Sequence, residues 1–253
     1  MGKEGKYIYC IICTKQERNF GPIGIGGRGD EVLTIGYEDL SMVVSNHSMT
    51  KLVVNRENII THEKVIEEVM KEFDGVLPMR FGTIACSADE IRNLLDRRYR
   101  EFKNALKDMG YMIELGVKGI WKNMDIIFKE IGEENKEIKG LKEIDNIRNV
   151  QGQKRIEQMI KKALEKKKEK QTEEIVDKLR RTSYDYKLNK TISDEMFMNS
   201  AFLIDRGREK EFDNIMDDFG DEYKDRIKFM YVGPLPPYNF VNITIYPEEW
   251  EIY

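Results

Sequence analysis

Residues 196–233, MFMNSAFLIDRGREKEFDNIMDDFGDEYKDRIKFMYVG, carry the clearest pattern of secondary structure in the chain. The opening MFMNSAFLID is an apolar run of strand length, and RIKFMYVG near the end is a second. Between them, residues 210–219 carry apolar side chains at helical spacing, with Gly220 in the position of a C-cap. Both strands are largely apolar, so we expect each to be covered on both faces. A strand–helix–strand unit of this kind predicts an α+β fold.

The segments before this unit extend the pattern. YMIELGVKGIW, residues 111–121, is typical of a strand, and a further strand near residues 184–188 would complete the order. Between these two, residues 122–181 are rich in Lys, Glu, Ile and Asn, which predicts a long helix or a helix pair. We expect its KKALEKKKEK run to be the most solvated part. The order of elements then resembles the ferredoxin-like βαββαβ plan with a long helical insert.

A second set of elements precedes residue 111. The sequence patterns predict three strands and one helix, the strands at residues 7–13, 32–35 and 42–44 and the helix at residues 58–73. Ser87 and Glu90 form the capping box of a further helix, which we expect to continue as one helix to Gly110.

These elements predict two domains and a tail. The expected boundaries are an N-terminal α+β domain at residues 1–110, a C-terminal ferredoxin-like domain at 111–238 and a tail at 239–253. The tail, which ends in VNITIYPEEWEIY, combines apolar side chains, among them Ile243, Ile245 and Trp250, with the acidic residues Glu248, Glu249 and Glu251. We expect it to fold back on the N-terminal domain, although it has the composition to add a strand to a partner.

Composition limits the classes of function. The 253 residues are 40% hydrophobic and 35% charged, with a net charge of −4, so neither nucleic acid nor an anionic membrane is expected as the main partner. The apolar runs are shorter than the roughly 18 residues of a membrane span, and MGKEGKYIY lacks the apolar core of a signal peptide. With three cysteines and no secretion signal, we expect a reduced, cytoplasmic protein.

The glycine cluster GIGGRG, residues 24–29, matches the G-x-G-x-x-G pattern of dinucleotide-binding loops. Such a loop turns directly off a strand and opens a helix, whose N-terminus binds the phosphates. Here Pro22 and other residues separate the glycines from the preceding strand, and EVLTIGYEDL after them has the β-branched content of a strand. We therefore interpret the cluster as a turn-forming loop and expect no nucleotide cofactor.

Other chemical motifs are weak. Cys10 and Cys13 form a C-x-x-C pattern, but residues three apart in a strand point to opposite faces, so we expect both to be buried structural cysteines. His62 and Glu63 begin an H-E-x-x-H pattern that fails at Ile66. We therefore expect no metal site, no catalytic residues and no small-molecule substrate.

Arg80 is a charged residue within the apolar, extended stretch LPMRFGT. Arginines in such surroundings are paired or face a partner. Two interpretations remain open: an internal salt bridge or snorkelling side chain, and an arginine that binds another protein.

Four stretches resemble the gas vesicle protein F/L family (GvpF/GvpL). They are YIYCII, TIGYEDLSMVVS, HEKVIEEVMKEFDGVLPMRFGT, and MNSAFLIDR followed by YVGPLPPYNFV. The pair LPMRFGT and GPLPPYNFV is the most specific part. The resemblance implies a family-specific N-terminal domain and a modified ferredoxin-like C-terminal domain.

The resemblance also implies a non-enzymatic role in the assembly of gas vesicles, hollow protein-walled compartments that give microbial cells buoyancy. The implied partners are the hydrophobic shell protein GvpA and other accessory proteins, with the gas vesicle and cytoplasm as location. Within the matching stretches and the tail, we expect partner-binding residues at Arg80, Phe81, Pro236, Tyr238 and Trp250.

Two alternatives remain. A ferredoxin-like regulatory or RNA-binding module would need exposed aromatic side chains on a basic sheet face. A nucleotide-using enzyme rests on GIGGRG alone and is the weakest of the three.

Overall fold

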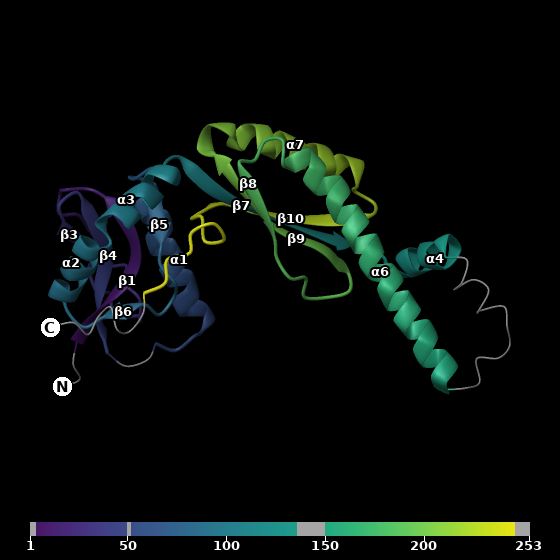
Figure 1. The fold of residues 1–253 in the computed structure, drawn as a ribbon, viewed down its shortest axis with the longest axis horizontal. Helices are drawn as coiled ribbons and strands as arrows, with labels where there is room; N and C mark the ends of the chain where they lie inside the picture. The colour runs from purple at the N-terminus through teal and green to yellow at the C-terminus, as the bar shows by residue number, and fades with distance from the viewer. Residues whose placement is uncertain (1–3, 50–51, 136–149, 246–253) are drawn as a thin grey trace. The chain divides into compact units, whose positions relative to one another are not determined.

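The computed structural model describes residues 4–49, 52–135 and 150–245, and the chain divides into two compact units. Met1–Glu114 and Pro234–Tyr253 form one, which we call the terminal unit, and Leu115–Gly233 form the other, the central unit. Figure 1 shows both units as mixtures of helices and strands. The terminal unit is thus assembled from both ends of the chain, and the central unit is inserted between them.

Strands of the terminal unit form a six-stranded sheet in the part of the chain that is described. They are β1 (Glu4–Cys13), β2 (Asn19–Gly21), β3 (Val32–Tyr37), β4 (Leu40–Ser48), β5 (Val76–Pro78) and β6 (Ile84–Ala85). The order is β2-β3-β4-β1-β5, with β6 also paired to β1. Every side chain from Tyr7 to Ile12 in β1 is fully buried, as expected for a central strand with both faces covered.

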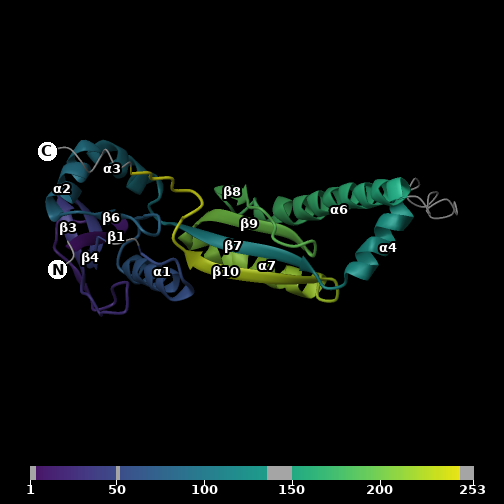
Figure 2. The same ribbon diagram turned by 90° about the horizontal axis from the view of Figure 1, so that it is seen from below.

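Helices cover the two faces of this sheet. They are α1 (Arg56–Met70), α2 (Ala88–Arg97) and α3 (Tyr99–Asp108). Figure 2 shows α1 on one side of the sheet and α2 and α3 on the other. A register shift between Ile8 and Cys10 in β1 turns Ile8 and Ile11 to the same face.

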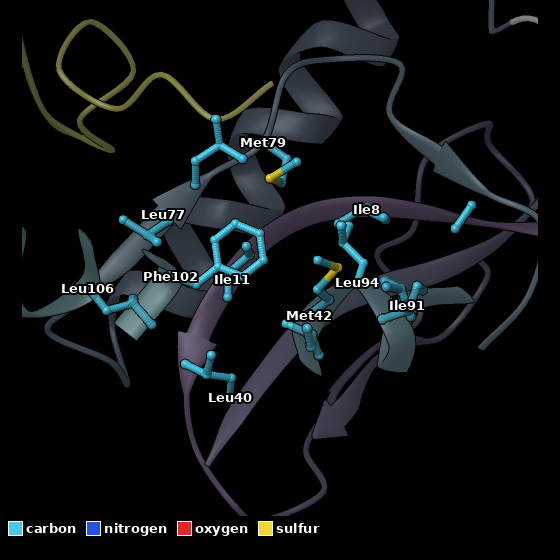
Figure 3. Packing of buried hydrophobic residues seen from close by; sticks show 14 residues of the cluster. Ile8, Ile11, Leu40, Met42, Leu77, Met79, Ile91, Leu94, Phe102 and Leu106 are labelled. Atoms are coloured by element: carbon cyan, nitrogen blue, oxygen red, sulfur yellow. The ribbon is translucent and has the colours of Figure 1, made fainter. Parts of the chain in front are cut away.

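The face covered by α2 and α3 holds the main core of the terminal unit, drawn in Figure 3. Ile8 and Met42 of the sheet pack there against Leu94 of α2 and Phe102 of α3, all with exposed fractions of 0%. Ile243, close to the C-terminus, belongs to the same cluster. The core therefore includes side chains from both ends of the chain.

The helix expected to run from Ser87 to Gly110 is in fact two helices, so this prediction is wrong. The break lies at Arg98, whose φ of −106° and ψ of 19° leave the helical region. Both halves bury their apolar residues in one cluster, so the apolar periodicity continues across the break and does not reveal it. The predicted cap is confirmed: Glu90 N donates to Ser87 Oγ at 3.2 Å.

The central unit contains a four-stranded sheet with the order β10-β7-β9-β8 among the described residues. Its strands are β7 (Met112–Trp121, which starts in the terminal unit), β8 (Asp185–Leu188), β9 (Met196–Asp205) and β10 (Ile227–Leu235). The helices are α4 (Met124–Glu134), α6 (Val150–Leu179), the short 3-10 helix η1 (Arg206–Arg208) and α7 (Glu209–Glu222). The expected strand near residues 184–188 and the helix pair within 122–181 are confirmed for the described residues.

α6 and α7 lie beside each other on the sheet of the central unit. Lys178 Nζ of α6 pairs with Glu222 Oε2 at 3.0 Å and lies 5.0 Å from the ring centroid of Phe219 in α7. Phe219 stacks in turn on Phe229 of β10, with centroids 5.7 Å apart. Through these contacts the two helices form a layer that packs against the sheet.

Two sequence-based expectations are wrong in the central unit. Gly220 lies inside α7, which continues to Glu222, because Tyr223 beyond it packs on Phe219 and Phe229. β10 is not covered on both faces: its alternate residues Met230 and Val232 are 42% and 48% exposed.

The KKALEKKKEK run is mostly exposed, as expected, but two of its lysines contact neighbouring elements. Lys168 is 6% exposed and its ammonium donates to Ser193 O at 3.1 Å. Lys167 bridges Glu130 and Glu134 of α4 at 2.9 and 2.8 Å. The run therefore attaches α6 to its neighbours.

Candidate partner-binding site

His62 is the centre of a buried polar network in the terminal unit. Helix α1 begins after Asn55, whose Oδ1 accepts from Asn58 N at 2.8 Å, and directs His62 toward β1. The side chain is 3% exposed. Its Nδ1 lies 2.8 Å from the Tyr7 hydroxyl and its Nε2 lies 3.1 Å from Met79 O.

The partners of His62 determine its tautomer. Met79 O is an acceptor, so Nε2 carries the proton and Nδ1 accepts from the Tyr7 hydroxyl. The Tyr7 oxygen in turn accepts from Gly82 N at 3.1 Å. Burial lowers the pKa of His62 from 6.5 to about 4, so the imidazole is neutral near pH 7. The network therefore fixes the backbone of residues 79–82, the centre of the LPMRFGT stretch.

Aromatic rings surround His62. Tyr9 stacks on it with centroids 5.7 Å apart, and Phe81 meets it edge-on at 5.8 Å. Tyr238, from the GPLPPYNFV stretch, lies at 6.4 Å on another side. The two most specific stretches of the sequence thus meet at one histidine. The Tyr238 hydroxyl is buried and has no hydrogen-bond partner among the described residues.

Arg80 points away from this network. The residues before it, from Val76 to Met79, are buried, whereas Arg80 itself is exposed. Its guanidinium donates to Asn242 Oδ1 at 2.8 Å. Arg80 forms no ion pair with the acidic residues that the structure describes, so an internal salt bridge does not account for it, whereas a snorkelling side chain and a partner-binding arginine both stay open.

The segment after Tyr238 crosses the terminal unit as an extended strap. Asn239 donates its backbone N and its Nδ2 to the buried carboxylate of Glu114, at 2.7 and 2.6 Å. Farther along, Arg98 donates to Thr244 O at 2.8 Å. Ile243 is buried in the main core, and its apolar neighbours two residues away on either side pack against the same cluster. Residues 241, 243 and 245 therefore face the core, and the residues between them face away from it.

The structure brings three of the expected partner-binding residues to one region. Phe81 and Tyr238 flank His62, and Arg80 next to Phe81 lies at the surface. Pro236 is buried, and Trp250 lies outside the described residues. Their role in binding stays a prediction.

Sequence reasoning missed His62, Tyr7 and Glu114 as organising residues. The one available signal was the position of His62 on the apolar stripe of α1, beside Val65 and Ile66. No sequence pattern pointed to Glu114, because its partner Asn239 is 125 residues away.

The glycine cluster is a loop between strands, as predicted. Gly26, Gly27 and Gly29 have φ values of 92°, 71° and 68°, which only glycine adopts readily. The chain then enters β3, so no helix N-terminus faces the glycines from within this loop.

The expectation for the cysteines is half wrong. Cys10 is buried, but Cys13 is exposed at the end of β1, where its Sγ accepts from Lys103 Nζ at 3.1 Å. The described residues contain no group of three or more side chains able to hold a metal ion. None of the helices searched in the described part of the chain is long and apolar enough to cross a membrane.

Comparison with known proteins identifies relatives along the whole chain. A family described as "Gas vesicle synthesis protein GvpL/GvpF" matches residues 5–242. The chain is 28% identical to gas vesicle protein F1 of Halobacterium salinarum over 248 residues, which is 97% of each chain. It is also 28% identical to gas vesicle protein F of Haloferax mediterranei, with 94% of each chain covered.

Two solved structures share the fold. The crystal structure of GvpF from Anabaena superposes with a TM-score of 0.82 at 21% identity, covering 96% of this chain and all of the other. That of GvpF from Microcystis aeruginosa superposes with a TM-score of 0.79 at 22% identity, covering 94% and 99%. At these identities the likeness concerns the fold.

Proposed function

Because the chain belongs to the GvpL/GvpF family of gas vesicle synthesis proteins, we propose that it is a non-catalytic assembly factor or minor structural protein of the vesicle. Its function is related to gas vesicles. In the proposal it acts in the cytoplasm and at the vesicle, and it binds the shell protein GvpA and other accessory proteins. The observation that carries the proposal is the family match over residues 5–242.

The physical task of such a factor is to cover apolar surface. A hydrophobic shell subunit aggregates unless a partner shields it before assembly. We propose that the surface around Arg80, Phe81 and Tyr238 binds this subunit, with Trp250 as a further contact and buried Pro236 as a rigid support. Arginines and aromatic residues are the residues that most often dominate protein interfaces. The buried network beneath Arg80 keeps this surface rigid, which lowers the entropy lost on binding.

We also propose that the central unit is a modified ferredoxin-like domain, and that the two units correspond to the two domains expected from the sequence. The strand order β10-β7-β9-β8, with α6 and α7 between the strands in sequence, supports this assignment. An RNA-binding role receives no such support, because the aromatic residues of β10, Phe229 and Tyr231, pack against α7.

Co-expression with GvpA tests the binding site. An affinity-tagged intact chain should retain GvpA, and Arg80→Glu should reduce the retained amount by about tenfold, as expected for an interface arginine. Arg100→Glu is the matched control, because Arg100 is an exposed arginine on α3 of the same unit. It should bind normally.

A third variant separates binding from support of the tail. Asn242→Ala removes the hydrogen bond to Arg80 but leaves the guanidinium in place. Normal binding by Asn242→Ala together with loss in Arg80→Glu supports a direct contact. Equal losses in both would assign Arg80 to holding the tail, and an intact chain that retains no GvpA would overturn the proposed function.

A further inference from the structure

A groove of about 520 Å³ lies entirely within the central unit, between α6 and the β8–β9 hairpin. Its helix side includes Glu169, Glu173 and Val176, and its strand side includes Tyr186 and Leu188. Leu188 is 58% exposed although it lies in a strand. We call the strand side the apolar wall and the helix side the acidic wall; Lys190 also lines the first, and Lys168 and Arg180 also line the second.

The apolar wall is also a free sheet edge. Among the described residues β8 pairs only with β9. Asn189 N donates to Asn199 O at 2.7 Å, so the residues that alternate with it, Leu188 and Tyr186, direct backbone groups away from β9. The Tyr186 N–H is bonded locally to Asp185 Oδ1. The carbonyl of Tyr186 and the N–H and carbonyl of Leu188 therefore point outward from the sheet edge, where an added strand would pair with them.

The acidic wall is a stripe along one face of α6. Glu165, Glu169 and Glu173 recur every four residues and all line the groove. All three are exposed, and they form no ion pair with the lysines and arginines of the described residues. The next acid, Asp177, pairs with Arg180 at 3.2 Å. The nearby ammonium of Lys168 is held by Ser193 O.

We propose that this groove binds an extended segment of a partner protein in which every second residue is lysine or arginine. The segment adds to the sheet beside β8, and because alternate side chains of a strand share one face, these cations all point into the groove. Their aliphatic stems pack on Tyr186 and Leu188, and their charged ends face the glutamate stripe. A second copy of this chain is a poor occupant, because two acidic stripes would repel each other. The site lies in a different unit from the Arg80 region, so it does not depend on the proposed function.

A labelled peptide of alternating lysine and valine, seven residues long by design, tests the proposal against the full chain by fluorescence anisotropy. We expect it to bind at least about tenfold more tightly than the matched peptide of glutamate and valine. Glu169→Lys/Glu173→Lys should weaken the binding of the lysine peptide by about tenfold or more. Asp218→Lys/Asp221→Lys changes two exposed acids of α7 by the same charge and should leave binding within about twofold.

Hydrogen exchange with the same peptide bound tests the strand addition. We expect slower exchange at residues 186–190 and no change in the terminal unit. The proposal is overturned if the lysine peptide does not bind. It is also overturned if the α7 control variant weakens peptide binding as much as the α6 variant does, because the peptide is then attracted only by the net charge of the chain. Binding without protection at residues 186–190 overturns the site.

Discussion

Acidification should destabilise the terminal unit through His62. The pKa of this imidazole is about 4 in the folded chain, against an ordinary value of 6.5. The unfolded chain therefore binds more protons between these two values, and stability falls as pH falls through that window. A difference of about 2.5 in pKa corresponds to about 3.4 kcal/mol in total, of which about 2 kcal/mol is lost between pH 7 and pH 5.

Urea unfolding at the two pH values measures this loss. The terminal unit can be followed by the reaction of the Cys10 thiol with dithiodipyridine, which labels thiols in mild acid. Cys10 is fully buried in the fold, and the background Cys13→Ser/Cys86→Ser removes the other two thiols. The free energy of unfolding is then obtained at each pH by linear extrapolation.

His62→Asn is the control for other titrating groups. Its Oδ1 still accepts from Tyr7, so the variant keeps one hydrogen bond but has no proton to gain. Glu63, whose pKa is raised by burial, acts in the opposite direction and is present in both proteins. We expect the variant to be less stable at pH 7 and to lose less than about 0.5 kcal/mol by pH 5. The reasoning is refuted if the parent and the variant lose equal amounts.

Three further outcomes are expected. Gly119→Ala should destabilise the central unit by about 1–3 kcal/mol, because the added Cβ would lie 2.3 Å from the Phe197 ring. In the double variant, Phe197→Leu should recover part of this loss. If urea unfolding shows that the two substitutions have additive effects, the packing argument is contradicted. Glu130→Gln should cost about 1–2 kcal/mol of central-unit stability in the same assay, because it replaces a two-point ion pair with Arg226 at 2.6 and 2.8 Å; an unchanged midpoint would show that the pair contributes nothing. Ile243→Ala should cost the terminal unit about 2–3 kcal/mol in the Cys10 labelling assay, and a neutral effect would mean that the tail does not pack on the core in solution.

The elements with strong local patterns were predictable from the sequence. The capping residue Ser87 marked the start of α2, and the apolar runs marked β1 and β9. The break at Arg98 was not predictable, because periodicity records which face is buried and not whether the axis is straight. The exposed face of β10 was missed for a related reason: apolar residues such as Met230 and Val232 also occur on surfaces.

The candidate site was predictable only in part. LPMRFGT and GPLPPYNFV were recognisable as stretches that resemble the family. That they meet at His62 was not predictable, because the contact depends on packing between segments more than 150 residues apart. A histidine on an apolar helix face is usually structural, and its hydrogen bonds to Tyr7 and Met79 are tertiary contacts with no sequence signature. The role of Arg80 was open from the sequence, and its bond to Asn242 shows why: the partner lies in the tail.

The insertion of the central unit has a consequence for the order of events during translation. Leu115–Gly233 leaves the ribosome before residues 241–245 do, so the central unit can fold while the terminal unit still lacks part of its core. During that interval the core around Leu94 and Phe102 lacks Ile243. The terminal unit, most of which is synthesised first, is therefore completed last. Chaperones that bind nascent chains have their longest opportunity to act on this unit.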